Sequence, residues 1–225
     1  MNIKDKIINL DTRDYHMHSL NFSDGFNSVD EIVKFAGDIG LTEIAITDHS
    51  QYAIDIHSRK SPSGRWLATR WKNVFNNINV IFGVEGDIIN DYGDVSFDIQ
   101  GKEGNFIILS LHKKPYKGSL ENVNLAYENA IKRHHKKIKF IGHPCLKETS
   151  EFLDIGKLVI LANKYNIPLE INGAGLMLGK IDLEKQKNML ELGDRFYINS
   201  DAHNLYELKE ARNFAINYLK ENGYI

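Results

Sequence analysis

The sequence predicts an α/β fold built on a parallel sheet. Seven short runs of β-branched or other apolar residues each precede a segment of helix length. Strands that alternate with helices in this way favour parallel pairing, in a sheet that is either open or closed into a barrel. The chain has 225 residues and only four prolines, with no Pro/Gly/Ser-rich linker. We therefore expect one domain over residues 1–225, within the size range of a single α/β barrel.

The expected strands are short and separated by amphipathic segments. The clearest helix begins at a capping box of Ser28 and Glu31, repeats its apolar residues on one face and ends at Gly40. Similar apolar faces recur over residues 155–165 and 205–219. The seven expected strands are Tyr15–His18, Glu43–Thr47, Val80–Val84, Phe106–Leu111, Ile138–Ile141, Pro168–Ile171 and Phe196–Asn199.

Composition and charge exclude several classes of protein. Hydrophobic residues make up 42% and charged residues 26% of the chain, which is typical of a globular protein and not of a disordered one. The net charge of −2 disfavours tight non-specific binding to nucleic acid. The single cysteine, Cys145, cannot form an internal disulfide, and its expected role is packing. No apolar run reaches the length of a signal peptide or membrane span, so we expect a cytoplasmic protein.

Histidines and carboxylates gather where the predicted strands end. Six of the nine histidines lie at or just after the carboxyl end of a strand: His16, His18, His49, His112, His143 and His203. Three carboxylates, Asp24, Glu85 and Asp201, follow the same rule. In a parallel barrel these ends share one face, which is the face that carries the active sites of barrel enzymes.

The spacing of these residues indicates metal binding. His16 and His18 alternate along a strand, so both imidazoles lie on one side, about 6.5 Å apart. Asp201 and His203 repeat the spacing. One such pair alone would more often be a feature of a surface strand, but five strand ends carry candidates together. Imidazole and carboxylate without thiolate suit Zn, Mn or Fe.

Several motifs resemble those of the polymerase and histidinol phosphatase (PHP) superfamily, over residues 14–210. The resemblance implies a distorted (β/α)7 barrel that binds two or three divalent metals at the strand ends and hydrolyses phosphoesters. The matching motifs are Asp14-Tyr15-His16-Met17-His18, Ser23-Asp24-Gly25, Thr47-Asp48-His49, Gly83-Val84-Glu85, Ser110-Leu111-His112, Gly142-His143-Pro144, Leu169-Glu170-Ile171-Asn172 and Ser200-Asp201-Ala202-His203.

The resemblance also implies a role for each residue. Its three ligand sets are His16, His18, Glu85 and Asp201; the bridging Glu85 with His112 and His143; and Asp24, His49 and His203. Among them Glu85, Asp201 and His203 are the expected catalytic residues. Some histidinol-phosphate phosphatases of this pattern carry histidine at the position of Asp24, which weakens that substrate assignment. We expect Glu170 and Asn172 to support a ligand.

The expected reaction is the hydrolysis of a small phosphomonoester by a metal-bridging hydroxide. Three divalent ions and three carboxylates leave a charge of about +3, which hydroxide and a monoester dianion would neutralise. Two alternatives stay open: a phosphodiesterase or 3′–5′ exonuclease on oligonucleotides, and a non-catalytic, metal-stabilised binding module. The expected partner is a small phosphorylated substrate. No membrane partner is expected, and nucleic acid is disfavoured although it could serve as a substrate.

Basic residues after the second strand could contact the phosphate. The segment Arg59–Lys72 leaves the predicted active face, and guanidinium groups match phosphate oxygens. The predicted contacts are Arg65, Arg70 and Lys113, although a solvated helix face would explain the same charges. His57 in this segment has no partner at metal-ligand spacing, and we expect it to take no part in the site.

Overall fold

The computed structural model describes residues 1–225, and its strands form two main sheets and a small hairpin. The first sheet contains β1 (Arg13–Asp14), β2 (Glu43–Ile46) and β3 (Asn79–Phe82), all parallel. The second has the order β11-β10-β9-β8-β4-β5 and is parallel except for β5 at its edge. Its strands are β4 (Val84–Ile88), β5 (Val95–Ser96), β8 (Ile107–Ser110), β9 (Ile138–Ile141), β10 (Leu169–Asn172) and β11 (Phe196–Asn199).

Isolated bridges join the two main sheets at two places. Met17, beyond β1, pairs in parallel with Ala202, beyond β11, and His49, beyond β2, pairs in parallel with Glu85 in β4. The strands therefore follow one another around a ring in which the hydrogen-bonded ladder is interrupted at these two junctions. The predicted parallel α/β fold is confirmed, and its form is a distorted barrel.

Gly83 divides one predicted strand into two. We expected a single strand over Val80–Val84, whereas β3 pairs with β2 and β4 pairs with β8. A Cβ atom on Gly83 would lie 2.4 Å from the carbonyl oxygen of Phe106 and 2.6 Å from a methyl carbon of Thr47. Only glycine allows this approach, so the chain can change sheets here and carry Glu85 towards the ends of the neighbouring strands.

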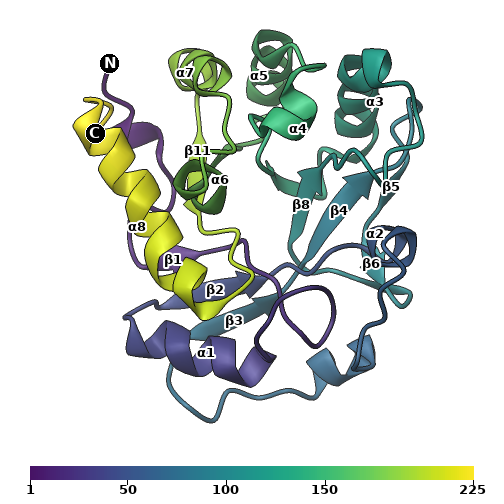
Figure 1. Cartoon of the computed structure of the whole chain (residues 1–225), viewed down its shortest axis with the longest axis vertical. Coiled ribbons are helices and arrows are strands. Elements are labelled where there is room, and N and C mark those ends of the chain that lie inside the picture. Colours follow the sequence, from purple (N-terminus) through teal and green to yellow (C-terminus); the bar gives the residue numbers. More distant parts are fainter.

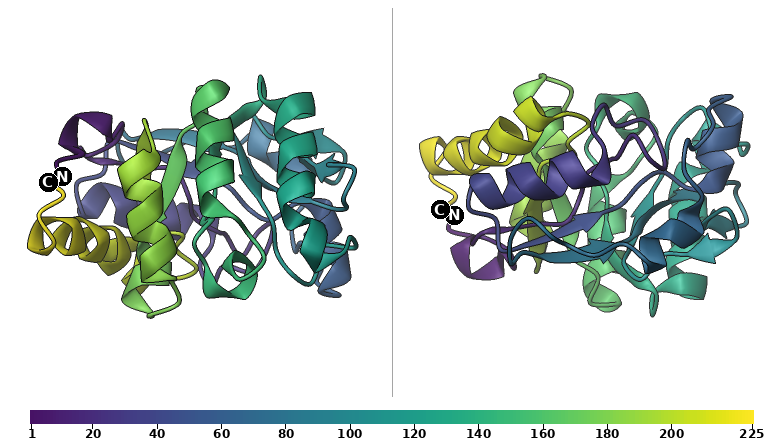
Figure 2. Two further views of the ribbon diagram at one scale, coloured as in Figure 1. Left: turned by 90° about the horizontal axis from the view of Figure 1, so that it is seen from above. Right: turned by 90° about the horizontal axis from the view of Figure 1, so that it is seen from below.

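The helices cover the outside of the sheets. Figure 2 shows α3, α5 and α7 side by side over the six-stranded sheet. Figure 1 shows α1 and α8 beside the three-stranded sheet of β1, β2 and β3. The capping box is confirmed: Ser28 accepts from Glu31 N, and the Glu31 carboxylate accepts from Ser28 N. The helices are α1 (Val29–Asp38), α2 (Gln51–Ile56), α3 (Val123–His134), α4 (Lys147–Ser150), α5 (Ile155–Lys164), α6 (Gly173–Met177), α7 (Leu183–Leu192) and α8 (Leu205–Glu221).

The sequence did not predict a short antiparallel excursion between β4 and β8. It contains β5, β6 (Asp98–Ile99) and β7 (Lys102–Glu103), each only two residues long. Two residues are too few to establish an alternating pattern, which explains why the prediction missed them.

The larger core lies between the six-stranded sheet and its covering helices. Leu109 and Ile141 from the strands pack in one cluster with Leu158 and Val159 of α5. Cys145 belongs to this cluster, with its sulfur 3.8 Å from that of Met189, and burial raises the pKa of its thiol. This agrees with a packing role. None of the helices combines the length and the apolar character that crossing a membrane requires.

Candidate metal centre

All nine predicted ligand residues meet at the carboxyl ends of the parallel strands. Each belongs to at least one group of side chains whose candidate ligand atoms lie within 4.8 Å of one another. Glu85 is the second residue of β4, and Asp24 comes from the loop before α1. The residues that follow strands are His16, His18, His49, His112, His143, Asp201 and His203. Residues up to 187 positions apart in the sequence therefore share one site.

Glu85 lies in the middle of the cluster, and its side chain is 1% exposed. Both of its carboxylate oxygens face imidazole nitrogens. Oε1 is 2.7 Å from Nε2 of His143 and 3.5 Å from Nε2 of both His16 and His112. Oε2 is 2.8 Å from Nδ1 of His49 and 3.7 Å from Nε2 of His18. One carboxylate thus contacts five histidines, which is the geometry expected of a group shared between ions.

Asp24 forms the outer part of the cluster. Its Oδ1 lies 3.5 Å from Nε2 of His49, 3.6 Å from Nε2 of His203 and 3.9 Å from Nδ1 of His18. The next residue must be glycine, because a Cβ atom on Gly25 would lie 2.1 Å from the carbonyl oxygen of His18. The close packing of this loop on the first strand therefore brings Asp24 to the histidines.

Glu170 and Asn172 contact candidate ligands from β10, as expected. Oε1 of Glu170 lies 2.9 Å from Nδ1 of His16, which leaves Nε2 of that ring facing Glu85 and Asp201. The Asn172 side chain donates to Oδ2 of Asp201 at 3.0 Å. A partner on the outer nitrogen fixes the orientation and tautomer of a ligating histidine.

Asp87 makes a similar contact, which the sequence analysis missed. Its Oδ1 lies 2.6 Å from Nδ1 of His112, and its Oδ2 accepts from the Ser50 hydroxyl at 2.7 Å. A signal was present in the sequence: Asp87 lies two residues after Glu85, so the two carboxylates share one side of β4.

Unpaired buried atoms show that the residues fit divalent metal ions. Within the cluster Oδ1 of Asp24, Nε2 of His16 and Nδ1 of His18 are buried and form no hydrogen bond. Oε2 of Glu85 and Nδ1 of His49 are buried 2.8 Å apart without the geometry of a hydrogen bond. Leaving a polar atom buried and unpaired costs about 1–3 kcal/mol. Imidazole nitrogens and carboxylate oxygens facing a common centre are the ligands that Zn, Mn and Fe accept.

The electrostatics keep the carboxylates charged. Burial raises the pKa of Glu85, but the surrounding His112, His16 and His49 outweigh burial and hold that pKa well below its usual value. Burial likewise raises the pKa of Asp201, and the neighbouring His16 and His18 reverse the shift. By contrast, burial and the positive charges of His203 and His49 lower the pKa of His18 to about 4. Its nitrogen lone pair is therefore available to a metal at neutral pH.

Two residues of the cluster have a strained backbone. His143 has φ 29° and Asp201 has φ 55°, in the left-handed region that only glycine adopts readily. Such conformations cost about 1–3 kcal/mol and collect at functional sites, where the surrounding structure maintains them. The fold therefore maintains an unfavourable backbone conformation at these two residues, which orients their side chains towards the cluster.

A cavity of about 270 Å³ opens onto the cluster. Seven of the candidate ligands, from Asp24 to His203, line it. Its other polar lining residues are Arg59, His57, Lys114, Lys180 and Glu148, and apolar side chains complete it. The volume is at the lower end of the range for ligand pockets, so a small molecule fits it best.

The predicted role of Arg65 as a phosphate contact is wrong. The residue is 3% exposed and does not line the cavity. Its guanidinium donates to the carbonyl oxygen of Gly83 at 2.6 Å, lies 3.9 Å from Oδ2 of Asp48 and covers the rings of Phe22 and Phe82. Arg65 therefore belongs to the structural support beneath the site.

The other predicted phosphate contacts also lie outside the cavity. Arg70 is exposed and stacks on Trp66, and Lys113 extends over Phe152. Two other basic residues line the cavity instead: Arg59 from the same basic segment, and Lys114, the sequence neighbour of Lys113. His57 lines it too, contrary to the expectation that it takes no part. One residue of displacement in a loop reverses the direction of a side chain, which sequence alone does not fix.

Comparisons with known proteins agree with this centre. The model of the PHP domain family matches residues 14–223. The chain is 30% identical over 212 residues to the DNA polymerase/3′-5′ exonuclease PolX of Bacillus subtilis, a match that covers 88% of the chain but 35% of that protein. A protein named probable phosphatase from Shewanella piezotolerans is 25% identical over 203 residues, with 87% of the chain and 79% of the relative covered.

A solved structure has the same fold. It is a histidinol phosphate phosphatase of Lactococcus lactis, complexed with Zn, L-histidinol and phosphate. Its TM-score is 0.57 at 18% identity, and the match covers 95% of this chain and 94% of that one. The fold and the cluster define a hydrolase of phosphoric esters, as expected. The chain belongs to the PHP domain family.

Proposed function

We propose that this chain, acting as one domain, is a metal-dependent phosphatase that hydrolyses a small phosphomonoester. The observation that carries the proposal is the position of Glu85, whose two carboxylate oxygens face five imidazoles beside a cavity of about 270 Å³. The unpaired buried atoms around it support the binding of two or three divalent ions, with Zn, Mn and Fe as the candidates.

The proposed ligand sets follow the three parts of the cluster. His16, His18, Glu85 and Asp201 hold one ion; Glu85, His112 and His143 hold the second; and Asp24, His49 and His203 hold the third. Bound divalent ions supply Lewis acidity, which activates water and offsets charge on the phosphoryl oxygens. Glu85, Asp201 and His203 are the proposed catalytic residues, because they line the cavity that would receive the phosphate.

The reaction breaks the ester bond between phosphorus and the leaving oxygen. An oxygen from water forms the new bond to phosphorus, and the products are inorganic phosphate and an alcohol that takes up a proton. Glu170 and Asp87 contact the outer nitrogens of His16 and His112, which aims the inner nitrogens at the ligand positions. No side-chain nucleophile is needed.

A 3′–5′ exonuclease is the second candidate, favoured by the 30% identity to PolX. Because the chain spans about a third of that protein, the activity of PolX as a whole does not transfer directly. The small cavity and the net charge of −2 favour a monoester, as does the coverage of 79% of the Shewanella relative named a phosphatase. A non-catalytic module would not need so complete a cluster.

The test is an activity screen of protein loaded separately with Zn, Mn or Fe. We expect phosphate release from small monoesters, with kcat/KM higher than for a dinucleotide. Glu85→Gln is the matched inactive control. A dinucleotide that exceeds every monoester would assign the chain to the exonuclease candidate. Stoichiometric metal without hydrolysis of either class would assign it to the binding module.

A further inference from the structure

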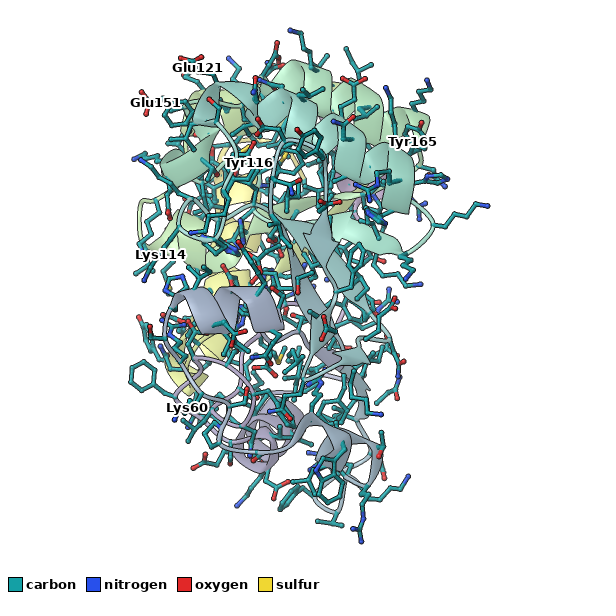
Figure 3. The ribbon with its side chains drawn as sticks, turned by 90° about the vertical axis from the view of Figure 1, so that its right-hand side faces the viewer. Lys60, Lys114, Tyr116, Glu121, Glu151 and Tyr165 are labelled. Carbon is teal, nitrogen blue, oxygen red and sulfur yellow. The ribbon has the colours of Figure 1, made fainter.

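Besides the proposed metal ligands, the cavity wall carries three cations from distant parts of the chain. Arg59 follows α2, Lys114 follows β8 and Lys180 follows α6. Only one carboxylate outside the proposed ligands, Glu148, lines the same cavity. In Figure 3, Lys114 lies at the edge of the molecule on the same side as Lys60, the sequence neighbour of Arg59. This wall therefore has an excess of positive charge.

The two lysines on this wall have no carboxylate partner. The lysines that form ion pairs are Lys132, Lys137, Lys157 and Lys209, all on the outer surface. The polar contact of the Lys114 ammonium is Nδ1 of His57, at 3.5 Å. Burial and the charge of Lys114 lower the pKa of His57, so the ring is uncharged and can accept from the ammonium. Both lysines therefore remain free to bind an anion.

Arg59 has a different partner. Its guanidinium forms an ion pair with Oδ2 of Asp24, whose other oxygen faces the histidines. We regard Arg59 as a positioning residue for Asp24, and it does not enter the test below.

Apolar side chains line the same cavity as the lysines and the candidate ligands. They include Ile54 of α2, Pro115 and Leu146. These side chains suit the carbon skeleton of a substrate whose scissile phosphate lies at the metal centre. A charged group at the far end of that skeleton would then meet Lys114 and Lys180.

We infer that Lys114 and Lys180 form a subsite for a second anionic group, so that the preferred substrates are small phosphomonoesters that carry another phosphate or a carboxylate. The inference rests on the proposed phosphatase function. Charge supports it: with three ions and hydroxide bound, one monoester dianion would balance the metal centre, and the two lysines share the cavity with a single further carboxylate, Glu148. A second anionic group supplies the missing charge.

The test uses three substrates with one three-carbon skeleton: glycerol 3-phosphate, 3-phosphoglycerate and glycerol 1,3-bisphosphate. We expect kcat/KM to rise from the first to the other two. Comparison of the carboxylate with the phosphate shows which anionic group is preferred. The preference is the kcat/KM of a doubly anionic substrate divided by the kcat/KM of glycerol 3-phosphate. Lys114→Gln and Lys180→Gln should each lower this preference by about tenfold, mainly through a higher KM for the doubly anionic substrate. Lys113→Gln is the matched control, because Lys113 is adjacent but does not line the cavity.

Binding provides a second readout that does not depend on turnover. Calorimetric titration of the metal-loaded protein with propylphosphonate and 3-phosphonopropionate compares one anionic group with two. The second ligand should bind about tenfold more tightly, and Lys114→Gln should abolish the difference.

The outcomes separate the two proposals. Hydrolysis of all three substrates with equal kcat/KM, or ratios that Lys114→Gln and Lys180→Gln leave unchanged, overturns the subsite and leaves the phosphatase proposal intact. No hydrolysis of any phosphomonoester in the earlier panel overturns the phosphatase proposal itself. A preference for a phosphate ester that carries an ammonium group would indicate that Glu148, and not the lysines, contacts the second charged group. That result would overturn the inference.

Discussion

Oδ1 of Asp87 lies 2.6 Å from Nδ1 of His112, and the opposite ring nitrogen of this histidine faces Glu85 at 3.5 Å. Asp87 is fully buried, and its side chain contacts this ring and the hydroxyl of Ser50. The contact fixes the orientation of the histidine, and Asp87 lies within reach of the same cluster without being one of the nine proposed ligands.

Replacement of Asp87 by asparagine should weaken metal binding. Without the carboxylate, His112 loses the partner that sets its tautomer, and changes of this kind typically cost 10–100-fold in metal affinity. Titration of metal-free protein with Zn or Mn measures the effect. Asp94→Asn is the control, since Asp94 is exposed and pairs with Arg133 far from the centre. Equal affinities of D87N and D94N would remove Asp87 from the supporting structure.

Glu85→Gln should reduce kcat more than His203→Asn at saturating metal. Glu85 contacts five histidines, and its side chain is 1% exposed. His203 faces one carboxylate of the proposed ligand set, that of Asp24, and its side chain is 32% exposed. Loss of the Glu85 charge therefore affects two proposed ions, and loss of the His203 ring affects one. Steady-state kinetics with measured metal content decides the comparison. Similar losses would contradict the bridging role.

The protein should bind at least two divalent ions per chain. Nine candidate ligands around the cluster exceed the coordination sphere of one ion. Elemental analysis after purification without chelators, followed by remetallation, measures the stoichiometry. A value of one or less after remetallation would rule out a centre with several metals.

Metal-free protein should lose stability as the pH rises above about 6.5. Burial lowers the pKa of His16, but Glu170, Asp201 and Glu85 outweigh it and hold this pKa well above its usual value; Glu85 and Asp24 act similarly on His49. A group with a raised folded-state pKa stabilises the fold below its ordinary pKa, and this contribution disappears as the pH passes through the raised value.

The measurement is denaturant unfolding of chelated protein at several pH values. His18 does not add to the change, because its pKa of about 4 leaves it uncharged throughout the range. Metal-loaded protein is the control, since bound ions replace the protons and should flatten the dependence. Constant stability of the chelated protein between about pH 6.5 and pH 9 would contradict the prediction.

Arg65→Met should lower stability and leave KM little changed. The substitution removes the hydrogen bond to Gly83 and leaves Asp48 buried without a neighbouring cation. We expect the free energy of unfolding to fall by about 3 kcal/mol. Arg70→Met is the matched control, because Arg70 is exposed and its loss should change stability by less than about 0.5 kcal/mol. Chemical unfolding and steady-state kinetics test both variants. A raised KM in R65M with unchanged stability would restore the phosphate-contact interpretation.

The order of strands and helices and the positions of the candidate ligands could be predicted from the sequence. The periodicity of apolar residues reports which side of a strand or helix is buried, as Ser28 and the apolar face after it demonstrate for α1. Parallel strands place their carboxyl ends together, so His16 and Asp201 could be assigned to one site from opposite ends of the chain. These inferences depend on local patterns that each segment carries by itself.

Only the tertiary structure decided which side chains reach the cavity. Lys114 lines it and Lys113 does not, and Arg65 is buried under the site that it was expected to serve. The change of sheets at Gly83 and the contact between Asp87 and His112 likewise depend on residues brought together from separate strands. A loop has no repeating pattern that records its direction, because its conformation is set by packing and hydrogen bonds to distant parts of the chain.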